Sequence, residues 1–387
     1  MGDVTDLFRE VSALAVFRGL YKLKTFSSIV SMLKDPAPEN IGIVAENLYR
    51  HNANISEYIA KAVTEDENSV LRRLARHESL PTEMERAMDA ELDILQRLSQ
   101  VTSDAVRGEY KGYLPGWATT DIDLHALYRQ RIDELFTKGY GIYSKYTAFM
   151  LKNGSIVPVS SPDRQRLSEL HSYEIQRRKV IDNTLALING KPAANCLLYG
   201  DAGTGKSSTV KAVVNEFAPQ GLRLIEIKKN ELCELPFIMD SISQNPLKFI
   251  IFIDDLSFSA DDEDFGMLKA ALEGSVSSKA DNAVIYATSN RRHLLREKFA
   301  DRSGDDVHAG DTRQEQASLS ERFGLKVTFL KPDKQVYLEI VEHLAAQYGI
   351  DMPTEELLAG AESYALRRSG RSGRAARHYV ESLVAVK

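Results

Sequence analysis

The first part of the chain, up to about residue 150, has apolar residues at the spacing of amphipathic helices. They recur every three or four positions, which places them on one face of each helix. The first such stripe consists of Leu7, Val11, Leu14, Phe17 and Tyr21. We predict a mostly helical domain over residues 1–150 whose stripes pack into its core, with docking of a partner by one helix as the alternative.

The pattern changes after residue 190, where short apolar runs alternate with helical stretches. The runs cover residues 196–199, 222–227, 247–253, 283–287 and 325–330. The third run is nearly continuous, which is typical of a strand buried on both faces of a parallel sheet. Strands that alternate with helices predict an α/β domain, which we place over residues 164–331. A purely helical pattern then predicts a small helical domain over residues 332–387.

The region between these two patterns is less regular. Residues 138–146 mix three tyrosines with lysines and glycines, a combination that can stack on and neutralise nucleic acid. Tyrosines at helical spacing also line half-buried faces, so both interpretations stay open. Residues 154–162 predict a short strand or a linker, and residues 167–190 predict a helix that leads into the first apolar run.

Composition describes an ordinary globular protein, with 43% apolar and 27% charged residues among 387. The net charge of −6 gives no general support for nucleic-acid binding. No apolar run approaches the roughly 20 residues of a membrane span, and the first residues do not resemble a secretory signal. Cys196 and Cys233 lie in apolar segments, so we expect reduced core thiols in a cytoplasmic protein.

The most specific signal is Gly-Asp-Ala-Gly-Thr-Gly-Lys-Ser at residues 200–207, the phosphate loop, which fits G-x-x-x-x-G-K-[ST] between a strand and a helix. Its backbone N–H groups and the helix N-terminus are expected to cradle the phosphates of ATP. Lys206 would reach the terminal phosphates, and the Ser207 hydroxyl would be a ligand for Mg²⁺. The predicted nucleotide-binding residues are Gly200, Asp201, Ala202, Gly203, Thr204, Gly205, Lys206, Ser207 and Ser208.

Two acids follow the buried strand 247–253, about fifty residues after the phosphate loop. We expect Asp254 to hold Mg²⁺, through a water because Mg²⁺ keeps much of its hydration. Asp255 is placed to orient the attacking water. Its side chain is one methylene shorter than the Glu that is usual at this position, which is compatible with slower turnover. The next strand ends in Thr-Ser-Asn, from which Ser289 and Asn290 are equal candidates to touch the γ-phosphate or the water.

Two arginines complete the expected site. Arg322 precedes the last strand in Ser-Glu-Arg-Phe-Gly and would neutralise charge on a nucleotide bound by a neighbouring subunit. Its alternative is an ion pair with a carboxylate such as Glu321. Arg374, in Gly-Arg-Ser-Gly-Arg-Ala-Ala-Arg at residues 370–377, would reach the phosphates from the helical domain.

In this order the motifs resemble those of the AAA+ ATPases. More narrowly, Tyr-Glu-Ile-Gln at 173–176, Ile-Asp-Asp-Leu-Ser-Phe, Ser-Asn-Arg-Arg-His-Leu, Ser-Leu-Ser-Glu-Arg-Phe-Gly-Leu and Arg-Ser-Gly-Arg-Ala-Ala-Arg are similar to a bacterial family of predicted AAA+ ATPases classed as a domain of unknown function. The resemblance implies a five-strand sheet of order 5-1-4-3-2, a helical lid and ATP bound between them. It also implies that an Asp-Asp pair need not mean inactivity.

These observations predict an ATPase that remodels a protein or loads it onto a partner, assembled as a homo-oligomeric ring or spiral. The alternative is a switch that binds ATP without hydrolysing it and acts through the N-terminal helical domain. A phosphotransferase is disfavoured because Arg322 and Arg374 lie in sequence contexts that resemble those of AAA+ ATPases.

Overall fold

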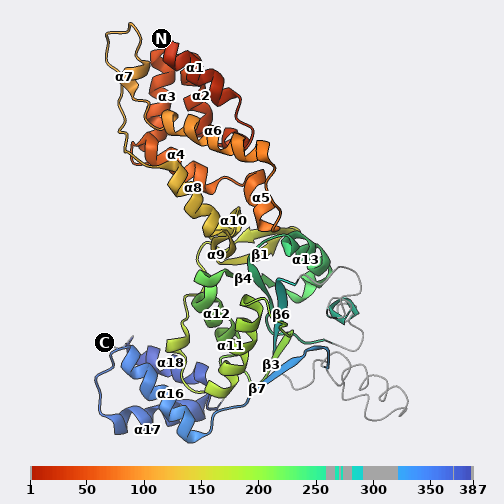
Figure 1. The fold of residues 1–387 in the computed structure, drawn as a ribbon. Coiled ribbons are helices and arrows are strands. Elements are labelled where there is room, and N and C mark those ends of the chain that lie inside the picture. Colours follow the sequence, from red (N-terminus) through yellow and green to blue (C-terminus); the bar gives the residue numbers. More distant parts are fainter. Residues whose placement is uncertain are drawn as a thin grey trace. The chain divides into compact units, whose positions relative to one another are not determined.

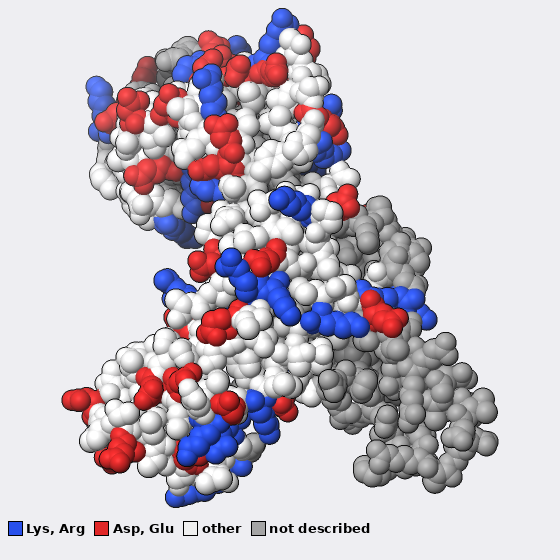
Figure 2. Space-filling view, turned by 60° about the horizontal axis from the view of Figure 1, so that its bottom comes forward, with Lys and Arg blue, Asp and Glu red and all other residues white. Residues whose placement is uncertain are grey.

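The computed structural model describes residues 2–258, 266–269, 272, 281–290, 321–368 and 370–384. The chain forms two compact units, residues 1–145 and 146–387, which are described separately (Figure 1). On the face shown in Figure 2, acidic and basic side chains are mixed over each unit. Among the described residues, no helix is both long and apolar enough to cross a membrane.

Unit 1 is helical, as the apolar stripes predict. Its elements are α1 (Gly2–Ser12), η1 (Arg18–Lys22), α2 (Lys24–Lys34), α3 (Pro38–Tyr49), α4 (Ile55–Glu65), α5 (Ser69–Ala75), α6 (Thr82–Leu98), α7 (Ser103–Val106), α8 (Leu124–Asp133), α9 (Leu135–Lys138) and α10 (Ile142–Lys145). Side chains cap several of them: those of Asn54, Asn68 and Asp123 accept a backbone N–H from the first turn of α4, α5 and α8.

The apolar stripes of unit 1 form its core, as expected. Leu7, Val11, Leu14 and Phe17 are buried in one cluster, and Tyr21 packs against it. Tyr140 and Tyr143 of the basic segment are half-buried, and burial raises the pKa of Tyr143 to about 12, whereas Tyr146 is exposed. This arrangement matches the packing interpretation of that segment.

Unit 2 combines a sheet with helices. Its elements are β1 (Ala148–Lys152), β2 (Ser155–Pro158), η2 (Leu167–Glu169), α11 (Glu174–Ile188), β3 (Cys196–Gly200), α12 (Lys206–Phe217), η3 (Ala218–Gln220), β4 (Leu222–Ile227), η4 (Lys229–Glu234), α13 (Leu235–Ser243), β5 (Lys248–Ile253), β6 (Ala283–Ser289), β7 (Leu325–Phe329), α16 (Lys334–Gln347), α17 (Thr354–Arg367) and α18 (Gly373–Val384). The five predicted strands are therefore all present.

The sheet has the strand order β2-β1-β4-β5-β6-β3-β7. The five predicted strands, counted along the chain from β3, lie in the expected order 5-1-4-3-2 from the β7 edge, and β1 adds a sixth parallel strand beside β4. The expected α/β class is confirmed, but the sheet is larger than the five strands predicted. β1 and β2 form an antiparallel hairpin that extends the sheet beside β4. Its two-residue turn, Asn153-Gly154, has φ angles of 53° and 71°, which suit a tight hairpin.

Helices cover both faces of the sheet (Figure 1). α11 and α12 pack on one face, where Val180 and Val210 join the side chains of alternate strand residues in one apolar cluster. α13 lies on the opposite face, because right-handed crossovers in opposite directions along the sheet place their helices on opposite sides. β5 is buried from Phe249 to Ile253, as its continuous apolar run predicts.

The last three helices, α16, α17 and α18, form a small helical subdomain with a core of its own around Tyr337, Ala361 and Val380, and we refer to this subdomain as the lid. The hydroxyls of two of its tyrosines donate to backbone carbonyls of α17, which ties the three helices together.

One expectation about cysteines is wrong. Cys196 is buried in β3 as expected, whereas Cys233 in η4 is exposed, because its short apolar segment turns only some side chains inward.

Candidate nucleotide-binding site

The phosphate loop leaves β3 at Gly200 and enters α12 at Lys206. Gly200 has a φ of 134°, and a Cβ there would lie 2.0 Å from the carbonyl oxygen of Phe329 in β7. Only glycine therefore lets the loop start this close to the neighbouring strand. Gly205 precedes the helix with a φ of 88°, so the loop turns and α12 presents its unpaired N–H groups to the cavity.

Lys206 is held at the wall of this cavity, with only 5% of its surface exposed. Its ammonium donates to the carbonyl oxygens of Gly200 at 3.0 Å and Asp201 at 2.7 Å, and to Oδ1 of Asn290 at 2.9 Å. Burial lowers the pKa of Lys206, and three nearby carboxylates oppose this shift. The ammonium is thus prepositioned at the loop, where an incoming phosphate could replace its carbonyl partners.

Ser207 and Asp254 meet at the start of α12. The Ser207 hydroxyl donates to Oδ1 of Asp254 at 2.6 Å, and both residues line the cavity. Hydroxyl and carboxylate oxygens are the ligands that Mg²⁺ takes from proteins, usually one or two per ion together with waters and phosphate oxygens. The two residues therefore fit a Mg²⁺ ion bound with a triphosphate.

Asp255 follows in a left-handed conformation, with a φ of 53°. Its backbone N–H donates to Oγ1 of Thr288 at 2.9 Å, and its Oδ1 accepts from the side-chain amide of Asn290 at 2.7 Å. Asn290 thereby connects Asp255 to Lys206. Of the two candidates at the end of β6, Asn290 lines the cavity, whereas Ser289 is completely buried and does not.

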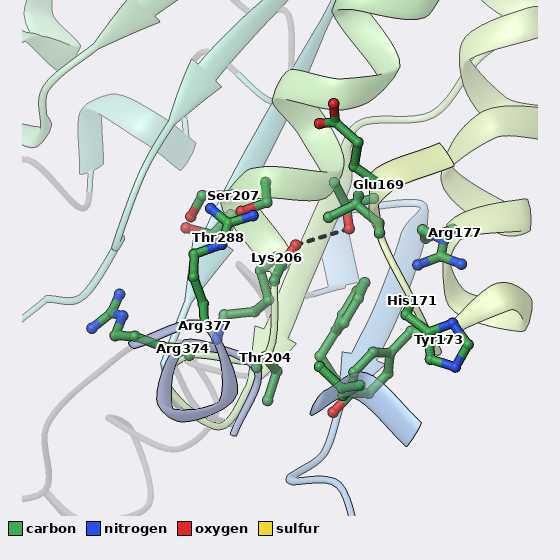
Figure 3. A pocket seen from close by; sticks show the side chains of 18 of the residues that line it. Glu169, His171, Tyr173, Arg177, Thr204, Lys206, Ser207, Thr288, Arg374 and Arg377 are labelled. Carbon is green, nitrogen blue, oxygen red and sulfur yellow. Dashed lines mark hydrogen bonds between the residues drawn. The ribbon is translucent and has the colours of Figure 1, made fainter. Parts of the chain in front are cut away.

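The cavity has a volume of about 600 Å³ and extends from the phosphate loop to an aromatic and apolar part, which we call the base slot. Its side chains include Leu170, Tyr173, Phe329, Ile340 and Leu344. In Figure 3, Lys206, Ser207 and Thr288 lie on one side of it, and His171, Tyr173 and Arg177 lie on the other. The Tyr173 ring is 5.3 Å from the ring of Phe329, and its hydroxyl donates to the carbonyl of Leu330 at 2.6 Å. A flat nucleobase would suit this slot.

The slot contains residues that the sequence analysis did not select. His171 stacks on His343 of the lid with ring centroids 4.8 Å apart, so the body of unit 2 and the lid meet at the cavity. Tyr173 was part of a quoted motif, which was the one signal that could have pointed to it. The two histidines are 172 positions apart in the sequence, and nothing in the pattern connects them.

The lid also touches the phosphate loop. The backbone N–H of Arg374 donates to the carbonyl of Gly203 at 3.1 Å, and the Arg374 and Arg377 side chains line the cavity (Figure 3). The Arg377 guanidinium donates to Oε1 of Gln165 at 2.9 Å. Arg371 instead makes a two-pronged ion pair with Glu362 within the lid.

Arg322 does not join this cavity. It lies just before β7, partly exposed, and is not among the residues that line the site of its own chain. Residues 291–294 and 318–320, which belong to the motifs of the sequence analysis, lie outside the described residues.

The family model described as "Protein of unknown function (DUF815)" matches residues 144–387, well over half of the chain. The chain belongs to the DUF815 family. This confirms the narrower of the two resemblances drawn from the motifs. The matched DUF815 region contains every residue that lines the cavity, whereas nearly all of unit 1 lies outside it.

Solved structures give a weaker likeness. The RuvB Holliday junction branch migration motor of Thermotoga maritima matches with a TM-score of 0.39 and 16% identity, over 56% of the DUF815 chain and 63% of the RuvB chain. A mutant of the same RuvB gives a TM-score of 0.40 with 16% identity over 56% and 64%. The DUF815 chain thus spans slightly less than two thirds of these structures, and so weak a likeness carries no argument about activity. No curated protein sequence matches the chain.

Proposed function

We propose that this DUF815 protein binds ATP with Mg²⁺ in the cavity of unit 2 and hydrolyses it to ADP and phosphate. The observation that carries the proposal is the convergence of the phosphate loop, Asp254, Asp255 and Asn290 on one cavity. A phosphate loop alone supports binding. The two acids beside it supply what hydrolysis needs in addition.

Each residue has a distinct part in this proposal. The loop N–H groups and Lys206 hold the phosphates, while Ser207 and Asp254 hold Mg²⁺. The bound ion would neutralise charge on the phosphate oxygens. Asp255 accepts a hydrogen bond from the attacking water and so orients it toward the γ-phosphate, and Asn290 fixes the Asp255 carboxylate on the side facing Lys206. Arg374 enters the cavity from the lid, so nucleotide binding is coupled to the lid position.

The proposal includes assembly. Arg322 lies away from the cavity of its own chain, as is required of an arginine that acts on a neighbour's nucleotide. Charge supplied at the transition state by such a residue is worth on the order of 10³–10⁵ in rate in other systems. We therefore place the active form as a homo-oligomer, a ring or a spiral, that uses ATP to remodel or load a protein partner in the cytoplasm.

The test is ATP turnover across a range of protein concentrations, followed by mixing of two variants. Arg322→Ala keeps the phosphate loop and should bind ATP normally but turn it over on the order of 10³-fold more slowly. Lys206→Ala keeps Arg322 but should bind ATP on the order of 100-fold more weakly or worse. Mixed at equal concentration, the two should recover part of the activity, because one interface then joins an intact loop to an intact arginine. Full activity of Arg322→Ala alone would exclude the shared site.

One observation favours a second function, a switch that binds ATP without hydrolysing it. Asp255 is shorter than the Glu usual at its position, and the amide of Asn290 already occupies its Oδ1. A water would then have to compete with this amide for the carboxylate. Tight Mg–ATP binding without turnover at any protein concentration would support the switch over the ATPase.

A further inference from the structure

Thr288 borders the cavity from β6, although only 1% of its surface is exposed. Its hydroxyl makes hydrogen bonds to both acids that follow β5. It donates to Oδ1 of Asp254 at 2.5 Å and accepts the backbone N–H of Asp255 at 2.9 Å. The single hydroxyl therefore uses its proton for one acid and a lone pair for the next.

The backbone of Thr288 adds a third contact to the same turn. Its carbonyl accepts the N–H of Leu256 at 2.7 Å. The pairing of β5 with β6 ends at Ile253 and Ala287, so the three bonds from Thr288 hold the segment that continues beyond the last strand pair. In this segment Asp255 takes a left-handed conformation, which is unfavourable for a residue with a Cβ. The hydrogen bonds from Thr288 offset this cost.

We propose that Thr288 is the positioning residue of the site, which fixes Asp254 for Mg²⁺ and Asp255 for the attacking water. This inference rests on the proposed function. The hydroxyl acts through the carboxylate of Asp254 and the backbone of Asp255 rather than as a ligand itself. Asp254 accepts hydrogen bonds on the same oxygen from Ser207 and Thr288, one from the phosphate-loop helix and one from β6. Removal of the second bond leaves Oδ1 of Asp254 with the Ser207 hydroxyl and a longer bond, at 3.2 Å, from the backbone N–H of Asp255, so the carboxylate is held less firmly.

Thr288→Val tests the inference, because valine has nearly the shape of threonine and lacks the hydroxyl. We expect ATP turnover to fall about 10-fold or more and the Mg²⁺ concentration for half-maximal activity to rise several-fold. ATP affinity without Mg²⁺ should stay within about twofold, since the phosphate loop is unchanged. Thr288→Ser keeps the hydroxyl and should recover most of the activity. If Thr288→Val does not fold, Thr288→Ala removes the same hydroxyl with less crowding.

Thr184→Val is the matched control. Thr184 is fully buried in α11, and its hydroxyl bonds with Tyr286 and the carbonyl of Val180, away from the cavity. Its valine variant should change stability without shifting the Mg²⁺ dependence. Wild-type turnover and Mg²⁺ dependence in Thr288→Val would overturn the positioning role while the proposed ATPase stands.

Failure of the ATPase itself gives a different result. If the wild-type protein binds ATP but does not turn it over, the inference is judged by how much Mg²⁺ strengthens ATP binding. Thr288→Val must then weaken this Mg²⁺ effect several-fold, and an unchanged effect would overturn the inference.

Discussion

Each unit of the chain holds a carboxylate in a set of short hydrogen bonds, and the two carboxylates differ in their partners. Glu91 in unit 1 is 6% exposed and accepts the backbone N–H groups of Ala15, Val16 and Phe17 at 2.8–3.1 Å. Asp254 in unit 2 is exposed at the cavity, where its Oδ1 accepts two side-chain hydroxyls at 2.5–2.6 Å and only one, longer, backbone N–H bond, from Asp255 at 3.2 Å. Backbone partners are fixed by the fold, whereas hydroxyls can turn toward a ligand.

The buried cations of the two units repeat this contrast. Arg131 in unit 1 donates to the carbonyls of Thr64 and Gly139 inside the helical core, and burial lowers its pKa. Lys206 also donates to two carbonyls and also has a pKa lowered by burial, but it borders a cavity of about 600 Å³. Burial of charge alone therefore does not mark a functional site. The marker is a buried charge with room beside it for a ligand.

The largest effect should come from Lys206→Ala. Loss of the ammonium should weaken ATP binding on the order of 100-fold or more, because hydrogen bonds between charged groups are the strong ones. Isothermal titration with ATP measures the change. Lys211→Ala is the control, since Lys211 lies on the same helix but pairs with Glu226 outside the cavity. Equal loss in both variants would mean that general charge, not the position of Lys206, binds ATP.

Asp255→Asn should have the next largest effect. The substitution keeps the size and removes the charge that orients the water, so turnover should fall about 100-fold while Mg–ATP still binds. Turnover and affinity are measured on the same preparation. Asp240→Asn, at an exposed position of α13, should change neither. A parallel loss of affinity in Asp255→Asn would make Asp255 a metal-binding residue instead.

The phosphate loop could be predicted because its residues are contiguous and each type has one physical reason to be there. The five strands from β3 to β7 could also be predicted, since buried strands leave apolar runs in the sequence. β2 falls within residues 154–162, for which a short strand was one of the two predictions, whereas β1 was missed because it is short and directly follows a helical region. Asn153-Gly154 between the two strands was the available signal.

The base slot and Thr288 could not be found in this way, because they depend on segments that only the fold brings together. His171 and His343 meet across the cavity from the body and the lid of unit 2. Thr288 was visible as one of three polar residues ending a strand, but its two acidic partners lie 34 and 33 positions away. The order of the strands in the sheet decides which of these three neighbouring side chains reaches the two acids.

Glu91→Gln should separate structural from functional carboxylates. In the wild type, three backbone N–H groups donate to the Glu91 carboxylate. The side-chain amide of Gln would place its own N–H group against these donors, so the free energy of unfolding of unit 1 should drop by about 2 kcal/mol. Trp117 is the single tryptophan and is buried in unit 1, so its fluorescence during urea unfolding reports on this unit. Glu85→Gln, exposed on the same helix, is the control. ATP affinity should be unchanged in both, and a loss of ATP binding in Glu91→Gln would contradict the comparison.

The smallest effect concerns Asp66, a partly buried carboxyl of unit 1 that lies against Gly19, where a Cβ would come within 2.2 Å of its Oδ1. Burial raises the pKa of Asp66 to about 6 from 3.8, against the opposing effects of a hydrogen bond from Asn68 and the charge of Lys22. The folded unit therefore binds more protons than the unfolded chain between these two values. Stability from this group is complete below about pH 4 and is lost as the pH rises through about 6.

Asp66→Asn should remove this dependence. Relative to the variant, the wild-type free energy of unfolding should fall by on the order of 1 kcal/mol between pH 4 and pH 7, an amount reduced because the carboxyl is partly exposed. Urea unfolding followed by Trp117 fluorescence across this range measures it, with Asp121→Asn as an exposed control in the same unit. A difference between wild type and Asp66→Asn that does not change with pH would show that Asp66 is not the titrating group. An increase of the wild-type value with pH, relative to the variant, would show that the folded unit favours the charged form of Asp66, against the expected effect of burial.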